Sequence, residues 1–271
     1  MRIIFNVVLL LIISITISAQ SEIPVTKRIG FSAGFQNRIL LDEQKSALVY
    51  RSGEYLAGLS FDRCSDRSFF SVSLEGSTGT MMPKYLGERW LYITSYDING
   101  SPEIDSFPLM AQLYNGIFQF TYMRVLNNSE NLSWLAGFSV KDYLVYPDNY
   151  TGLFNSLGIH IKAGFRLKTT ARSVFRTDVS FPLIALNSRL PWHNTATDPL
   201  DSEIKTFFKK GTRLTGPDKL RLLEFSAAWD MQVSKHWALG ASYGFNWLNV
   251  TYHQPMRSYV NSFRIQTHYT F

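Results

Sequence analysis

Apolar and polar side chains alternate with a two-residue period in roughly ten separate segments of this sequence. Because successive side chains of a strand point to opposite faces, each segment predicts a strand with one apolar and one polar face. The clearest alternation runs from Leu157 to Lys168. The predicted strands cover residues 29–35, 55–61, 70–74, 114–122, 134–140, 157–167, 175–181, 223–233, 237–247 and 258–271.

The connections between these segments also follow a pattern. The polar turns after the second, fourth, sixth and eighth segments are only a few residues long, at 63–67, 126–131, 169–172 and 234–236, whereas the other connections are longer and two are much longer. An even number of strands, with short turns at one end and long loops at the other, is typical of a transmembrane β-barrel. A soluble β-sandwich has no reason to keep this rhythm. The sequence therefore predicts an all-β fold, a transmembrane antiparallel up-and-down barrel of about ten strands.

The two longest connections contain predicted elements of their own. Residues Trp90–Tyr96 alternate and predict a further strand, and residues Ser202–Lys210 predict a short helix. Aromatic rings beside cations are suited to contact lipopolysaccharide phosphates, glycans or a partner protein. The predicted external contact residues are Trp192, His193, Phe207, Phe208, Lys209 and Lys210. The alternative is that these loops fold over the mouth of the barrel and bury one another.

Composition is compatible with a barrel that hides its apolar residues at alternate positions. Aromatic residues make up 15% of the chain, yet the mean hydropathy is only −0.06, far below that of a helical membrane protein. The formal charge of +6 is scattered along the sequence and gives no reason to expect nucleic acid as a partner. Cys64 is the only cysteine, so no internal disulfide forms. We expect Cys64 to lie at a turn and to be incidental.

The amino terminus has the pattern of a secretory signal peptide. Arg2 precedes an apolar run from Ile3 to Ile17, and the small residues Ser18 and Ala19 follow. This order predicts cleavage after Ala19, with residues 1–19 as the signal peptide and residues 20–271 as the barrel. A permanent anchor helix is the alternative, but the run is shorter than the roughly 20 residues that a membrane-spanning helix needs.

The final predicted strand carries a resemblance to a known class of proteins. Phe263, Ile265, Tyr269 and Phe271 share one face, and the sequence ends on that aromatic residue. This strand resembles the closing strand of Gram-negative outer-membrane β-barrels. The Ser-Ala-Gln start and the aromatic-rich strands resemble barrels of Bacteroidota-type bacteria. The resemblance implies a location in the outer membrane, contact with outer-membrane lipid and lipopolysaccharide, and recognition of this strand by the barrel-assembly machinery.

If the apolar faces meet lipid, the polar faces line the lumen. A narrow barrel encloses little free space, so charges there must pair and accept or donate hydrogen bonds. We expect a plugged or narrow lumen in a protein whose external loops contact the envelope or a partner, and a small passive pore is the alternative. The predicted lumen charges are Glu54, Lys141, His160, Lys162, Arg166, Arg176, Asp178, Glu224, Asp230, Arg264 and His268.

A barrel hydrolase that acts on envelope lipid or protein is a further hypothesis. Adjacent predicted strands bring His160, Asp178 and Ser180 together, but any polar lumen contains such residues. The serine-histidine-asparagine pattern of outer-membrane phospholipases is absent from the sequence. So are the aspartate pairs and the Asp-x-His arrangement of barrel proteases. His193 and His253 lack metal-ligand spacing, so we predict neither a metal nor a cofactor, and a non-enzymatic function is the stronger expectation.

Overall fold

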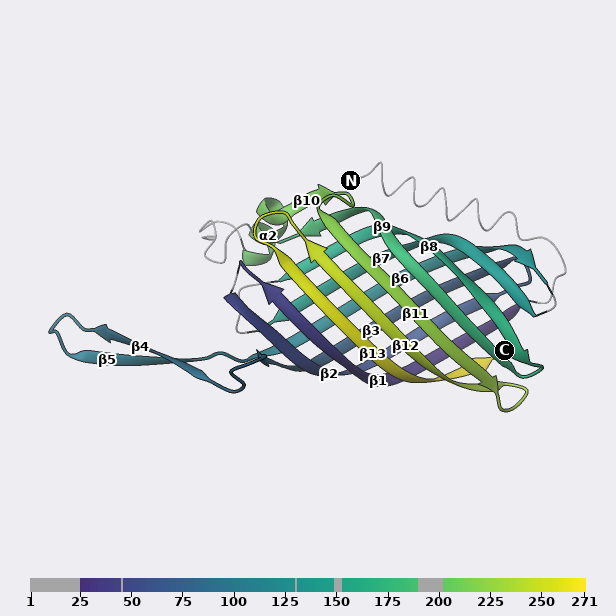
Figure 1. Ribbon diagram of the computed structural model, residues 1–271, viewed down its shortest axis with the longest axis horizontal. Coiled ribbons are helices and arrows are strands. Elements are labelled where there is room, and N and C mark those ends of the chain that lie inside the picture. The colour runs from purple at the N-terminus through teal and green to yellow at the C-terminus, as the bar shows by residue number, and fades with distance from the viewer. Residues whose placement is uncertain (1–24, 45, 130, 149–152, 190–201) are drawn as a thin grey trace.

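The computed structural model describes residues 25–44, 46–129, 131–148, 153–189 and 202–271, which fold into a closed antiparallel β-barrel of ten strands (Figure 1). This confirms the predicted fold class. The predicted signal peptide, residues 1–19, lies outside the described residues. The barrel strands are β1 (Thr26–Asp42), β2 (Ser46–Cys64), β3 (Ser68–Pro83), β6 (Ala111–Asn128), β7 (Leu132–Pro147), β8 (Phe154–Thr170), β9 (Ser173–Ser188), β11 (Leu220–Gln232), β12 (Trp237–Val250) and β13 (Met256–Thr270).

Each barrel strand pairs with the next one along the chain, and β13 pairs with β1 to close the ring. The connections 65–67, 129–131, 171–172 and 233–236 lie at one end, which we call the turn end. The remaining connections lie at the other end, which we call the loop end. Both chain ends of the barrel, Thr26 and Thr270, lie at the turn end, since Arg28 of β1 is paired with Thr270 of β13.

The strands are longer than the sequence predicted. They contain 13 to 19 residues, whereas about 9–11 residues are enough for a strand to cross a bilayer. The additional length lies mainly at the loop end. There the connections 43–45 and 251–255 are short, although longer loops were predicted after the first and ninth strands. The two long connections predicted at residues 76–108 and 184–218 correspond to the connections between β3 and β6 and between β9 and β11.

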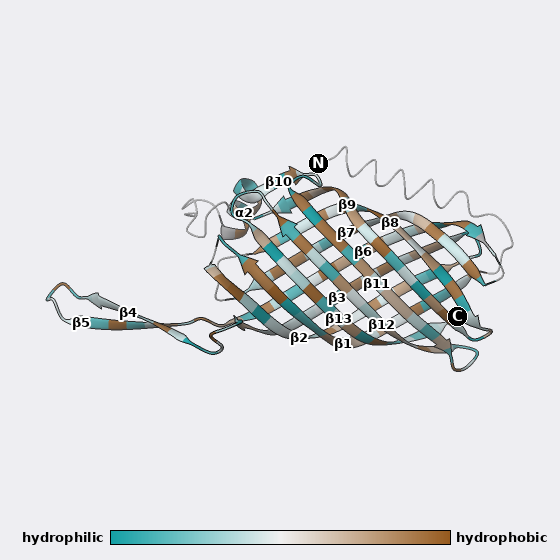
Figure 2. Cartoon of the chain, viewed as in Figure 1, coloured by the Kyte–Doolittle hydropathy of each residue, from teal (hydrophilic) through white to brown (hydrophobic). Residues whose placement is uncertain are grey.

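The residues that face inward and outward change in character along the barrel strands. Figure 2 shows hydrophobic and hydrophilic residues alternating along these strands. In the turn-end half of β1, Phe31 and Phe35 point outward and are 51% and 43% exposed, while Ser32 points inward. In the loop-end part of the same strand, Asn37 points outward and Leu40 points inward and is buried. Outward polar residues and inward apolar residues recur near the loop ends of the other strands. That arrangement is the one a protein adopts in water.

All ten barrel strands contribute to an apolar cluster inside the loop end, which we call the apolar cap. Its side chains are at most 8% exposed, and those of Leu113 and Val250 are fully buried. Burial of one such side chain contributes roughly 1.5–3 kcal/mol. The apolar cap consists of Leu40, Tyr50, Met81, Ala111, Leu113, Val145, Phe154, Ala185, Leu220, Leu222, Leu248, Val250, Tyr252 and Met256.

The two long connections carry ordered elements at the loop end. Strands β4 (Trp90–Tyr96) and β5 (Pro102–Pro108) form a separate two-stranded sheet that projects beyond the barrel (Figure 1). Helix α2 (Glu203–Gly211) is capped by Ser202, and β10 (Thr212–Thr215) pairs with β9 beyond the end of β11. The predictions of a strand at residues 90–96 and of a helix in this loop are confirmed. Within the described residues, no helix is long and apolar enough to cross a membrane.

Candidate functional site

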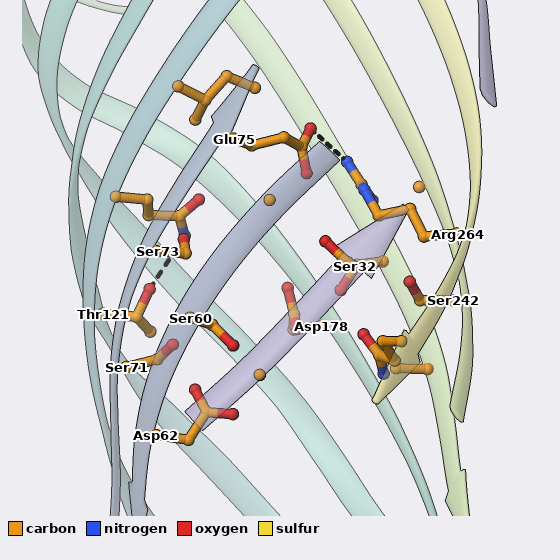
Figure 3. A pocket seen from close by; sticks show the side chains of 18 of the residues that line it. Ser32, Ser60, Asp62, Ser71, Ser73, Glu75, Thr121, Asp178, Ser242 and Arg264 are labelled. Atoms are coloured by element: carbon orange, nitrogen blue, oxygen red, sulfur yellow. Dashed lines mark hydrogen bonds and ion pairs between the residues drawn. The ribbon is translucent and has the colours of Figure 1, made fainter. Parts of the chain in front are cut away.

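A polar chamber of about 240 Å³ lies inside the barrel, on the turn-end side of the apolar cap. A cavity needs roughly 10–15 Å³ of such volume to hold one water molecule, so the chamber has room for several. Figure 3 shows side chains from several strands pointing into it. The labelled residues are Ser32, Ser60, Asp62, Ser71, Ser73, Glu75, Thr121, Asp178, Ser242 and Arg264.

Two ion pairs form between side chains that line the chamber. The ammonium nitrogen of Lys162 lies 2.9 Å from Oδ1 of Asp178, and Nη2 of Arg264 donates to Oε1 of Glu75 at 2.8 Å. The four side chains are only 13–20% exposed. Each charge therefore has an opposite charge beside it, as partly buried ions require.

A third group of charges surrounds Glu224. Lys141 donates to Oε1 of this carboxylate, Ser180 donates to Oε2 at 2.8 Å, and Nδ1 of His160 lies 3.6 Å from Oε2. The hydroxyl proton of Ser180 thus points to a carboxylate that Lys141 already neutralises. A serine nucleophile needs a free base that accepts its proton. These contacts link strands β7, β8, β9 and β11 in the barrel wall, and they do not form a catalytic triad.

The most enclosed charge in the lumen is Glu54, whose side chain has no exposed surface. Arg38 donates from Nε to Oε1 of Glu54 at 2.9 Å, and Nη1 of Arg38 donates to the Tyr143 hydroxyl at 2.5 Å. The remaining donors to the Glu54 carboxylate are Gln36, Ser52, Ser77 and Asn115, at 2.5, 2.6, 2.8 and 2.5 Å. A carboxylate with five donors from four strands fixes the mutual register of β1, β2, β3 and β6.

Asp230 and Arg176 occupy the turn-end part of the lumen. Gln266 donates to Oδ1 of Asp230 at 2.8 Å, and Nε2 of His268 lies 3.5 Å from the same atom. The guanidinium of Arg176 lies over the ring of Phe69, 4.8 Å from its centroid. Phe69 in turn packs into a small apolar cluster with Met123 and Leu135, and Cys64 packs against that cluster. Cys64 is the last residue of β2 and half-buried, so it lies at the strand's end beside the turn.

The structure divides the predicted lumen residues into separate groups. All eleven belong to strands of the barrel, yet Arg166 and Arg176 stand directly opposite each other on β8 and β9 as like charges. Sequence reasoning missed the side chains that surround Glu54, above all Arg38, Asn115 and Tyr143. A signal was present, because Gln36, Arg38 and Leu40 continue the inward parity of the first strand beyond its predicted end.

The predicted external contact residues differ in their exposure to solvent. Phe208 is 47% exposed, but Phe207 is 4% exposed and packs edge-on against Phe208, so only one of the two rings is open to a partner. Lys209 and Lys210 lie in the last turn of α2 and are exposed. Trp192 and His193 lie outside the described residues.

An ion pair ties the loop-end connections together. Arg189, just after β9, pairs with Asp42 of β1 and donates from Nη1 to the backbone oxygen of Gln254 at 2.5 Å. The neighbouring Tyr252 is packed into the apolar cap, and this burial raises its pKa to about 12, although Arg189 and Arg213 act in the opposite direction. The connections around the mouth are therefore packed against one another. Among the described residues, no group of three or more histidine, cysteine, aspartate or glutamate side chains is placed to hold a metal ion.

No protein-family model and no curated protein matches this sequence. Solved structures with the same kind of fold do match. The outer membrane protease OmpT from Escherichia coli shares 10% identity over 91% of this chain and 96% of its own, with a TM-score of 0.49. An outer membrane channel from Pseudomonas putida F1 shares 10% identity over 93% and 98%, with a TM-score of 0.43. The fold is that of an outer-membrane β-barrel. At such low identity the likeness extends to the fold alone.

Proposed function

We propose that this chain is an outer-membrane protein with a closed lumen, which conducts no solutes and presents binding surfaces at its loop end. The observation that carries the proposal is the reversal of side-chain pattern along the barrel. Around the chamber the outward residues are apolar and the inward residues mostly polar, while at the loop end inward residues form the apolar cap and polar residues such as Asn37 point outward. A polypeptide has this reversal where it leaves hydrocarbon and enters water.

The apolar belt supports a membrane location. Leu59, Leu74, Ile161 and Ile265 point outward from four different strands and are 57%, 58%, 48% and 64% exposed. A monomer in water rarely exposes so large a continuous apolar surface. The predicted C-terminal insertion residues Phe263, Tyr269 and Phe271 extend the same belt. Contact with outer-membrane lipid, and recognition of this strand by the assembly machinery, are parts of the proposal.

The apolar cap supports a closed lumen. Side chains that border a water-filled pore must be exposed to that water, but the cap's side chains from all ten strands are at most 8% exposed. The chamber lies on the turn-end side of the cap and is lined mainly by polar residues. These features favour a closed barrel over a passive pore. The arrangement around Ser180 favours a non-enzymatic function over a hydrolase.

Single-channel recording in planar bilayers tests the closed lumen. We expect the refolded wild-type protein to be silent, because the cap leaves no continuous water path. A variant with Tyr50→Ala, Leu113→Ala and Phe154→Ala removes three cap side chains and should give steady channels. The matched control, Phe35→Ala with Tyr55→Ala and Leu59→Ala, removes similar volume from the outward face and should stay silent.

Heat-modifiable migration on a gel verifies that each variant forms a folded barrel before it is recorded. Steady conductance of the folded wild-type protein would overturn the closed lumen. Silence of the folded cap variant would show that something other than the apolar cap blocks the barrel. Both results are read from the same recording.

A further inference from the structure

The hairpin β4–β5 exposes apolar side chains on both of its faces. Large apolar residues make up about half of its strands, and the tip residue Ile98 is fully exposed. A two-stranded hairpin alone is at best marginally stable in water. Because the described chain leaves these faces uncovered, the hairpin has the properties of a surface that a partner covers. The exposed residues are Trp90, Leu91, Tyr92, Ile93, Tyr96, Ile104 and Phe107.

The two outer edges of the hairpin differ. Strand β5 begins with Pro102 and ends with Pro108, and it carries Glu103 and Asp105. Proline has no N–H to donate, and prolines and charges on an edge strand oppose the addition of another strand. Strand β4, Trp90–Tyr96, has neither a proline nor a charge and is rich in residues that favour strands. Its outer edge is unpaired in this sheet and is open to a further strand.

The charge of the hairpin selects the partner. Residues 90–108 contain Asp97, Glu103 and Asp105 and no lysine or arginine, although the whole chain has a formal charge of +6. Glu103 and Asp105 pair across the hairpin with Ser95 and Ile93, so both carboxylates lie on one face. Strands are about 4.8 Å apart, so a strand added to β4 would lie about 10 Å from them. That distance is about one Debye length, within which cations on the added strand are attracted.

We propose that the open edge of β4 binds an extended segment of another protein that carries lysine or arginine, by β-strand addition. Main-chain hydrogen bonds along the seven residues of β4 would supply affinity, and the aromatic and acidic faces would select the sequence. A second copy of this chain is the less favoured occupant, because two hairpins that each carry three uncompensated acidic residues repel each other. The proposal rests on the proposed function, which places the loop end outside the membrane.

Binding of a model strand to the detergent-solubilised full chain tests this proposal. The probe is a fluorescent ten-residue peptide that alternates valine and lysine, and the control peptide alternates valine and glutamate. We expect the lysine peptide to bind at least tenfold more tightly. Hydrogen exchange should show new protection of the amides of residues 90–96, with a smaller change across residues 102–108 and none in the barrel.

Two lysine substitutions provide a matched pair. Thr94→Lys and Ser106→Lys add the same charge to the same face of the hairpin, but only the first lies on β4. We expect Thr94→Lys to weaken binding at least tenfold more than Ser106→Lys does. Equal effects of the two, protection spread over the barrel, or no binding of the lysine peptide would overturn strand addition at β4. Channel recordings decide the closed lumen separately, so either proposal can fail while the other stands.

Discussion

Replacing Glu54 by glutamine is expected to lower the free energy of unfolding of the barrel by about 3–5 kcal/mol, because it leaves the Arg38 guanidinium buried without its counter-ion. The side chains of Arg38 and Glu54 are 3% and 0% exposed, so water cannot replace the missing charge. The new amide group also places two hydrogens among Gln36, Ser77 and Asn115, which already donate to that position. Urea titration of the protein folded in lipid vesicles measures the change.

Two further variants test whether the loss of stability comes from the unpaired buried charge of Arg38. Glu75→Gln breaks a pair with Arg264 whose side chains line the polar chamber and are 18–20% exposed, so we expect a loss of about 1 kcal/mol or less. A double variant, Arg38→Met with Glu54→Gln, removes both charges and should recover most of the loss. Equal losses for Glu54→Gln and Glu75→Gln would contradict the role assigned to the enclosed pair.

Ile161→Arg is expected to cost about 2–4 kcal/mol of unfolding free energy in lipid, because it places a cation in the middle of the hydrocarbon layer. Ile161 lies near the centre of β8, points outward and is 48% exposed. Its neighbours on that face, Ile159 and Ala163, are apolar, so the membrane offers the charge no partner.

A matched control places the same substitution at a different depth in the membrane. Leu239 is also 48% exposed and outward, but it is the third residue of β12 and lies close to the turn end. At the membrane interface an arginine extends its charge into water, so Leu239→Arg should cost only about 0–1 kcal/mol. Equal costs for the two variants, measured by the same urea titration in vesicles, would contradict the proposed position of the bilayer.

The barrel could be predicted from the sequence because a period of two is read directly along each strand. The alternation from Leu157 to Lys168 became β8 with the expected sides, and the lengths of the connections gave the antiparallel order. The ends of the strands were harder to predict from the sequence. The first strand was predicted to stop at Phe35, where the outward apolar run meets Asn37, yet β1 continues to Asp42.

The physical reason is that the rule of an apolar outside holds only at the depth of the hydrocarbon. Beyond that depth the side chains that point inward are apolar, as at Leu40 and Tyr50. A sequence reading that expects outward residues to be apolar along the whole strand therefore assigns these residues to a loop. The hydrogen-bond partners of lumen residues could not be predicted for a different reason. Asn115 and Glu54 are 61 residues apart in the sequence, and only the register of the closed sheet brings them within 2.5 Å.

The apolar cap has a consequence for how this barrel responds to temperature. Its side chains are removed from water rather than from lipid, so melting the loop end transfers them into water and raises the heat capacity. Contacts of this kind weaken on cooling. The loop end is therefore expected to exchange its amide hydrogens faster near 0 °C, relative to the lipid-facing half, than it does at room temperature. In the cold, the loop-end mouth of the barrel would loosen while the lipid-facing half stays closed.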